Sequence, residues 1–193
     1  MKKYGEVLDF HGHSCPGLAL GYRVSLRALA EFKGRAGDEE LVAVVENNSC
    51  AVDAVQVMTG CTFGKGNLLF RDYGKQVYTF IKRPSGRSVR ISVHWQRTHE
   101  SSKEKAMWDR YVKGDNSQKV LQFVRDSKEE KVRHILEADE GGIMTMTKGR
   151  QAAPEEARIY SGIVCSVCCE KVMEPRARIK GGNILCIPCF EKD

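Results

Sequence analysis

Apolar residues recur every three or four positions in the stretch PGLALGYRVSLRALAEFKG. The repeating residues are Leu18, Tyr22, Leu26, Leu29 and Phe32. This spacing is typical of an amphipathic helix that buries one face. Pro16 would stand in the first turn and Gly34 lies beyond the last apolar residue, and these residue types favour such positions at helix ends. The pattern therefore predicts a helix between Pro16 and Gly34.

Two shorter segments follow this helix. Glu40–Glu46 (ELVAVVE) is a continuous apolar run rich in valine, which suits a buried strand. Cys50–Gly60 (CAVDAVQVMTG) has the pattern of a second helix, and glycine is a residue that commonly ends one. We therefore expect a strand followed by a helix before residue 61.

From Asn67 onward, apolar and polar residues alternate along NLLFRDYGKQVYTFIKRPSGRSVRISVHW. Turn-forming residues interrupt the alternation at 73–75 (Tyr-Gly-Lys) and at 84–86 (Pro-Ser-Gly). Alternation with a period of two is typical of strands that are buried on one side. The simplest interpretation is three antiparallel strands.

The segment after these strands is predicted to be mainly helical. Ser101–Glu104 and Ser127–Glu130 both fit the Ser-x-x-Glu capping box that often begins a helix. An edge strand is expected around Ile143–Thr147. The glycine, proline and mixed charges that follow, up to Ala157, are typical of a linker.

Composition indicates a folded protein with metal sites or reactive thiols. Hydrophobic residues make up 41% and charged residues 29% of the 193 residues, as in ordinary globular domains. No run approaches the ~20 apolar residues that span a bilayer, and the basic start of the chain lacks the apolar segment of a signal peptide. We therefore expect a cytoplasmic protein with no membrane partner. Eight cysteines in that compartment favour metal binding or thiol chemistry over disulfides.

The last 30 residues contain two Cys-x-x-Cys pairs. They are Cys165 with Cys168 and Cys186 with Cys189, separated by 17 residues. This spacing is typical of a four-thiolate zinc site, and iron in the same cage or a redox dithiol pair are the alternatives. So short a segment cannot bury a useful core, so a bound metal would supply its folding energy, about 10–16 kcal/mol in such modules. Cys169 is spare, and we expect it to pack or stay exposed unless the register shifts.

A basic stripe precedes the second pair of cysteines. Arg176, Arg178 and Lys180 alternate, so they would share one face of a strand. The net charge of +6 is spread along the chain, and the stripe has no aromatic stacking platform. We expect a solvated face rather than a nucleic-acid surface.

The segment DFHGHSCPG gathers His11, His13 and Cys15 at alternate positions directly before the first predicted helix. If this stretch is extended, all three side chains point to one side and could bind one metal ion. Cys15 would lie at the helix N-cap, where free N–H groups and the helix dipole favour a thiolate. The alternative is that the histidines satisfy local hydrogen bonds and that a small residue merely precedes the helix.

The second predicted helix repeats this arrangement. Cys50 lies at its start, where it too would favour a thiolate, and Asp53 lies on the same face. Cys61 follows the helix, and of the two cysteines it is the one we expect in the core. His13, Cys15 and Cys50 together would form a three-ligand site with an open position for water or substrate.

Three motifs resemble, in order, the FmdE family of formylmethanofuran dehydrogenase proteins. They are DFHGHSCPGLALGYR, ENNSCAVDAVQVMTGCTFGKGNL and YGKQVYTF. The final segment, CSVCCEKVMEPRARIKGGNILCIPCF, is similar to the zinc finger of the DksA/TraR proteins.

The resemblance implies an α+β main domain over residues 1–150, with helices packed on an antiparallel sheet. A linker at 151–161 and a zinc-ribbon or treble-clef-like finger at 162–193 would follow. It implies Zn²⁺ in the finger and a second divalent metal, with zinc first in line, in an N-terminal pocket. The implied pocket residues are His11, His13, Cys15, Cys50 and Cys61, with Asp53 nearby.

The resemblance also implies association with the core subunits of a molybdenum or tungsten oxidoreductase that reduces CO₂ onto methanofuran. The leading hypothesis is thus a metal-binding accessory protein, and we expect it to be a homodimer. One alternative is a stand-alone enzyme in which Cys15 or Cys50 is the nucleophile and His11 or His13 the base. Its candidate catalytic residues are Cys15, Cys50, His13 and Asp53. A second alternative is a regulator whose finger contacts nucleic acid or polymerase.

Overall fold

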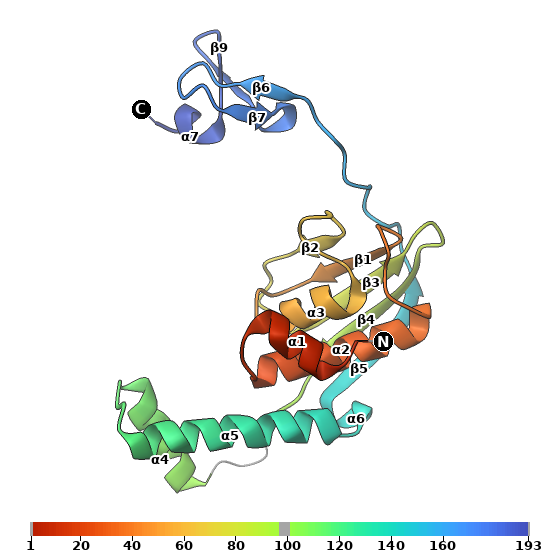
Figure 1. Ribbon diagram of the computed structural model, residues 1–193. Helices are drawn as coiled ribbons and strands as arrows, with labels where there is room; N and C mark the ends of the chain where they lie inside the picture. Colours follow the sequence, from red (N-terminus) through yellow and green to blue (C-terminus); the bar gives the residue numbers. More distant parts are fainter. Residues whose placement is uncertain (1, 97–100, 193) are drawn as a thin grey trace. The chain divides into compact units, whose positions relative to one another are not determined.

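The computed structural model describes residues 2–96 and 101–192 (Figure 1). The chain divides into two compact units, residues 1–156 and 157–193. The boundary falls in the stretch 151–161, which carries no helix or strand and joins the last strand of the first unit to the first strand of the second.

The first unit is built on a five-stranded sheet with the order β2-β1-β3-β4-β5. The strands are β1 (Leu41–Val45), β2 (Leu68–Phe70), β3 (Val77–Lys82), β4 (Arg87–Val93) and β5 (Met144–Arg150). All neighbours pair antiparallel except β1 and β2. The α+β class with a mainly antiparallel sheet is therefore confirmed, and β5 is the edge strand that the sequence predicts.

The strand β2 corrects one expectation. It runs parallel to β1, with Ala43 opposite Leu68, whereas an antiparallel strand was predicted. Between the two strands the chain passes through the helix α3 (Ala51–Thr59). A crossover helix returns the chain to the end at which it started, so the next neighbouring strand points the same way. Alternation of side chains cannot reveal that direction.

Two helices cover one face of the sheet (Figure 1). They are α2 (Pro16–Phe32) and α3, and their apolar sides pack on alternate residues of the central strands. The core between them contains Val24, Phe32 and Val55 from the helices with Tyr78 and Phe80 from β3. The two predicted helices are thus confirmed, and the core holds their N-terminal ends in fixed places.

A further helix, α1 (Tyr4–His11), was not predicted from the sequence. Its one buried residue, Val7, packs with Leu18, Leu29 and Met58 on the outer side of α2 and α3. An eight-residue helix is marginal on its own, and its stability comes from such packing. The helix matters for function because it ends at His11.

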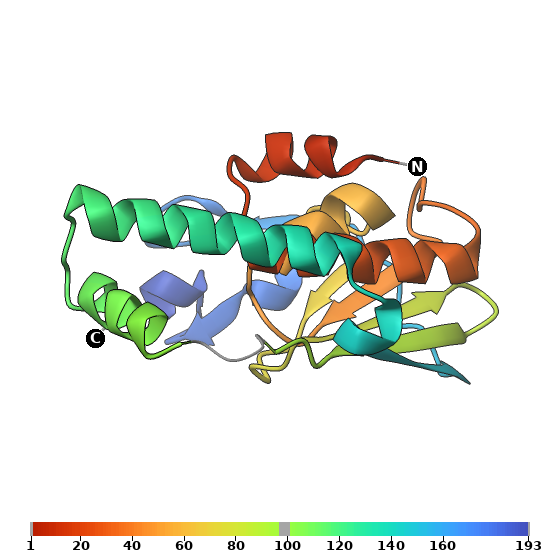
Figure 2. The same ribbon diagram turned by 90° about the horizontal axis from the view of Figure 1, so that it is seen from below.

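The helices α4 (Ser102–Val112), α5 (Gln118–Glu137) and α6 (Glu140–Ile143) connect β4 to β5. Figure 2 shows α4 alongside α5. The capping box at Ser101 is confirmed, since its hydroxyl accepts the Glu104 N–H at 3.3 Å. The box predicted at Ser127 is wrong, because Ser127 lies buried inside α5, whose apolar face already begins at Val120.

The finger consists of two hairpins and a short helix. Its elements are β6 (Gly162–Val164), β7 (Lys171–Met173), a 3₁₀ turn at Glu174–Arg176, β8 (Arg178–Lys180), β9 (Asn183–Leu185) and α7 (Ile187–Phe190). Its buried residues are Cys165, Leu185 and Cys186. So small a core cannot hold the hairpins together without a metal ion.

Within the described residues, none of the helices combines the length and the apolar character that crossing a bilayer requires.

Candidate metal centre

The N-terminal ligand candidates lie on a helix end and a loop, not on an extended strand. His11 is the last residue of α1, and Gly12 follows with a φ of 87°, which a residue with a side chain rarely adopts. The Gly12 N–H closes the helix on the Leu8 carbonyl at 2.8 Å. The predicted alternation of His11, His13 and Cys15 is therefore wrong, but the turn at Gly12 still brings the three side chains together.

Cys15 is the N-cap of α2, as predicted. Its sulfur accepts the Leu18 N–H at 3.4 Å, and Pro16 occupies the first helical position. The expectation of a lowered pKa is not met. Partial burial raises the pKa of the Cys15 thiol, and the neighbouring Cys50 thiol raises it further, against the opposite effect of the Leu18 N–H. A bound cation is the partner that would favour the thiolate here.

Cys50 is the N-cap of α3 and ends a loop that is held by polar contacts. The Asn47 side chain donates to the Lys75 carbonyl at 2.8 Å and accepts the Ser49 hydroxyl at 2.7 Å. The buried Tyr78 hydroxyl donates to Gln76 at 2.7 Å beside this loop. These contacts fix the approach of the chain to Cys50.

Two glycines let the starts of α2 and α3 come close to each other. A Cβ on Gly21 would lie 2.6 Å from the Ala51 Cα, and a Cβ on Gly17 would lie 3.3 Å from the Cys50 Cβ. Backbone cannot move out of the way as a flexible side chain can, so the contact at Gly21 requires glycine. The close crossing brings the caps Cys15 and Cys50 to the same place.

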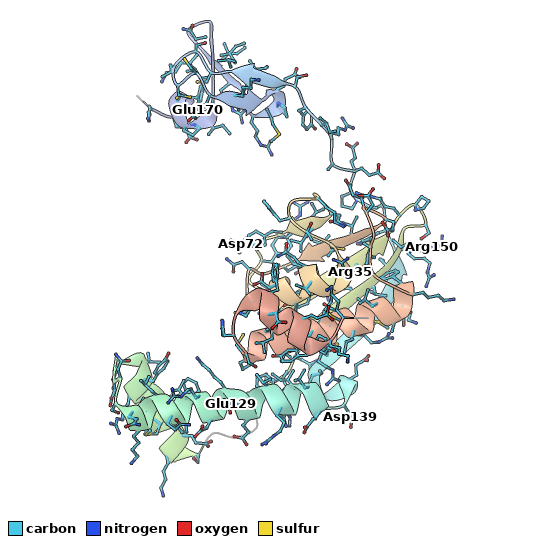
Figure 3. The ribbon with its side chains drawn as sticks, in the orientation of Figure 1. Arg35, Asp72, Glu129, Asp139, Arg150 and Glu170 are labelled. Atoms are coloured by element: carbon cyan, nitrogen blue, oxygen red, sulfur yellow. The ribbon has the colours of Figure 1, made fainter. Side chains whose placement is uncertain are left out.

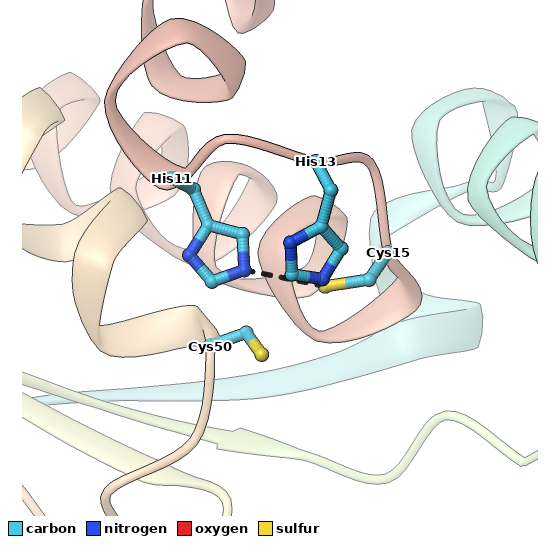
Figure 4. A group of neighbouring side chains, drawn as sticks. All are labelled: His11, His13, Cys15 and Cys50. Carbon is cyan, nitrogen blue, oxygen red and sulfur yellow. Dashed lines mark hydrogen bonds between the residues drawn. The ribbon is translucent and has the colours of Figure 1, made fainter.

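The donor atoms of His11, His13, Cys15 and Cys50 all lie within 4.8 Å of one another. Figure 4 shows their side chains converging from α1, the following loop and the start of α3. The Cys15 sulfur is 3.8 Å from His11 Nε2. In a tetrahedral zinc site, bonds of ~2.0 Å to nitrogen and ~2.3 Å to sulfur place donor atoms about 3.3–3.8 Å apart. This set, which we call the His-Cys centre, fits a single ion with small adjustments.

Asp53 lies beside the His-Cys centre and contacts His11. The carboxylate oxygen Oδ2 is 2.7 Å from His11 Nδ1, and the His11 side chain is only 10% exposed. This contact leaves Nε2 directed at the Cys15 sulfur. A carboxylate in this position fixes the tautomer and orientation of a metal-binding histidine. Asp53 therefore orients His11 and is not one of the converging donors.

Cys61 is not part of the His-Cys centre. It is fully buried in the core, and its thiol donates to the Leu41 carbonyl at 3.2 Å. Burial raises its pKa to about 11. The structure thus corrects its place among the candidate ligands and supports the alternative that it is a core residue.

The finger brings Cys165, Cys168, Cys186 and Cys189 together, with all four sulfurs within 4.8 Å of one another. Backbone N–H groups of Cys168, Cys186 and Val167 point at the Cys165 sulfur and lower its pKa to about 6, which favours a thiolate ligand. Cys169 is exposed with a φ of 61° and lies outside the set. All eight cysteines are free thiols in this structure.

Two family models match the chain. Residues 10–145 match the family described as FmdE, molybdenum formylmethanofuran dehydrogenase operon. Residues 158–193 match the prokaryotic dksA/traR C4-type zinc finger. The first match covers the whole His-Cys centre, and the second covers all four cysteines of the finger.

A curated relative and a solved structure extend these matches. A probable S-adenosyl-L-methionine-binding protein of Archaeoglobus fulgidus is 32% identical over 190 residues, which are 94% of this chain and 50% of that protein. This chain thus spans about half the length of that relative. The crystal structure of an FmdE-like protein of tungsten formylmethanofuran dehydrogenase from Syntrophus aciditrophicus superposes with a TM-score of 0.57. It is 21% identical and covers 98% of this chain and 93% of its own, which shows the shared fold.

The matched ranges, the fold and the two sets of converging side chains agree. The chain belongs to the FmdE family and carries a C-terminal zinc finger of the dksA/traR C4 type.

Proposed function

We propose that this protein holds two metal ions with separate roles. The finger binds a structural zinc, and the His-Cys centre binds a second divalent ion, with zinc as the first candidate. The observation that carries the second ion is the convergence of four donor atoms within 4.8 Å. Two imidazole nitrogens and two thiolates suit zinc, iron or nickel.

The four donors change the chemistry expected of the His-Cys centre. A site with three protein ligands leaves a position for water or substrate, whereas four ligands complete a tetrahedron. His13 is the exposed member of the set, and its ring lies on that of His11 with centroids 4.5 Å apart. A small molecule would therefore reach the ion by replacing His13, and the bound ion would then polarise it as a Lewis acid.

The pKa of Cys15 supports the metal over the rival nucleophile. A cysteine nucleophile needs a lowered pKa so that its thiolate is present at neutral pH. Partial burial and the Cys50 thiol instead raise the pKa of Cys15. An ion between the two sulfurs removes this conflict, because it binds both as thiolates.

For the whole protein we propose an accessory role beside the core subunits of a molybdenum or tungsten formylmethanofuran dehydrogenase, as a homodimer. Membership of the FmdE family supports the role. We do not extend the S-adenosyl-L-methionine binding named for the Archaeoglobus fulgidus protein, because this chain spans only half of it.

Elemental analysis of the purified protein tests the two metal sites. We expect about two ions per chain, with Cys15→Ala or His13→Ala removing one and Cys165→Ala removing the other. Cys169→Ala is the matched control, because this free cysteine lies outside both sets. A single ion that persists in Cys15→Ala would rule out the His-Cys centre as a metal site.

A further inference from the structure

A cleft of about 670 Å³ lies on the first unit, away from both sets of metal ligands. Its apolar lining comes from the second half of α2 and the end of α3, and its rim carries basic side chains. The lining residues that matter are Leu26, Leu29, Ala30 and Met58, with Lys33 and Arg35 at the rim. Leu29 and Met58 are at most 5% exposed, so the floor is continuous with the core.

The charge at the rim is unbalanced. Among the described residues, Glu6 is the one carboxylate that lines the cleft, and it is already bound to the Lys2 ammonium at 2.7 Å. Within residues 2–96 and 101–192, no carboxylate lies within ion-pair distance of Lys33 or Arg35. Two cations without an acidic partner beside an apolar floor are complementary to an anion that has an apolar body.

Arg35 (labelled in Figure 3) is held in place before any ligand binds. Its Nε donates to the Val57 carbonyl at 3.2 Å, at the end of α3. Its side chain also covers Gly60, where an added Cβ would lie 3.2 Å from the Arg35 Cγ. The terminal nitrogens of the guanidinium stay available for a planar anion, which arginine binds with two parallel hydrogen bonds.

Arg35 also lines a second, adjoining cleft of about 460 Å³, together with Phe10 and Val57. Phe10 is 60% exposed there. The guanidinium thus lies where two apolar surfaces meet, which places the charged end of a ligand between them.

Lys33 occupies a backbone conformation that usually belongs to glycine. It caps α2 with a φ of 57° and a ψ of 38°, in the left-handed region. Glycine at this position would remove the strain but also the ammonium group. The lysine is therefore retained at a cost to the backbone, and its side chain lies at the rim of the cleft.

We propose that this cleft binds a small amphiphilic carboxylate, with its apolar body on Leu29 and Met58 and its carboxylate on Arg35 and Lys33. The site is independent of both metal centres. Its ligand is neither a metal ion nor a macromolecule, because the enclosed volume is that of a small molecule.

Isothermal titration of the full, metal-loaded chain with octanoate tests the proposal. Octanoate is expected to bind at least tenfold more tightly than acetate, which lacks the apolar body, and than octylammonium, which reverses the charge. Arg35→Met should weaken octanoate at least tenfold. Arg71→Met, which removes an exposed arginine outside the cleft, should leave it unchanged.

Two further variants separate binding from folding. Lys33→Gly should weaken octanoate several-fold while the protein stays at least as resistant to heat, since glycine suits the backbone there. Ala30→Phe, at an exposed position in the cleft, should abolish binding by filling it. Metal content should not change in either variant.

The remaining outcomes would overturn the proposal. Equal affinities for octanoate and octylammonium would exclude a role for the two cations. Unchanged octanoate binding by Ala30→Phe would place the ligand elsewhere. Loss of octanoate binding in Cys15→Ala would show instead that the carboxylate binds the ion of the His-Cys centre.

Discussion

The contact between Asp53 and His11 shows how one residue outside a ligand set can determine its geometry. Asp53 lies one turn beyond Cys50 on α3, so the helix that supplies a sulfur ligand also supplies the carboxylate that orients a nitrogen ligand. With Nδ1 engaged at 2.7 Å, His11 can offer only Nε2 to the ion. The sequence places Asp53 on the face of Cys50, but not its partner.

Replacement of Asp53 by alanine should weaken metal binding at the His-Cys centre by about 10–100-fold, because His11 would lose its fixed orientation. Asp53→Asn should have a smaller effect, since its amide oxygen can still accept the Nδ1–H. Competition with a chromophoric chelator measures the affinity, and Asp72→Ala, an exposed aspartate, is the control. An unchanged affinity in Asp53→Ala would contradict this role.

At the scale of elements, the crossing of α2 and α3 decides whether the His-Cys centre exists. Cys15 and Cys50 are 35 residues apart in sequence and meet because each caps one of these helices. Gly17 and Gly21 face α3 at the crossing and leave no room for side chains. Packing of the helices on the sheet therefore brings the two sulfurs together.

Gly21→Ala should destabilise the protein by about 1–3 kcal/mol, because the new methyl group would overlap the Ala51 backbone. It should also weaken the ion of the His-Cys centre, since α2 and α3 would have to separate. Thermal unfolding and metal content measure the two effects. Gly5→Ala on α1 is the matched control, because nothing lies within 4 Å of an added Cβ there, and it should be neutral or stabilising.

At the scale of the whole molecule, α4 and α5 form a pair with an open apolar cleft. Ala106, Met107 and Phe123 line it, and both positive and negative side chains surround it, among them Lys103 and Asp126. A surface that carries both charges beside an apolar strip can pair with a copy of itself about a two-fold axis. This cleft is the surface on which we base the proposed homodimer.

Light scattering of the purified protein at micromolar concentration is expected to give the mass of a dimer. Met107→Glu should shift it to the mass of a monomer, because a carboxylate would be buried at the centre of the contact. Val112→Glu, at a residue that is 80% exposed and outside the cleft, should stay dimeric. A monomeric wild-type protein would dismiss the proposal.

Local chemistry made several features readable from the sequence. The finger's cysteines lie two residues apart within each pair, so the covalent chain itself brings the paired sulfurs close. Pro16 and the apolar spacing determine the start of α2, and Cys15 is its cap for the same reason. The candidate ligands His11, His13, Cys15 and Cys50 could be named because each flanks such a local signal.

Tertiary structure decided what depends on contacts between distant segments. The short α1 has only Val7 fully buried, so its helical state depends on packing against α2 and α3. The parallel direction of β2, the burial of Cys61 and the pairing of His11 with Asp53 likewise depend on partners far along the chain. Residue patterns record which side chains can bind or pack, but the choice of partner is made when helices and strands pack together, because only then are distances between them set.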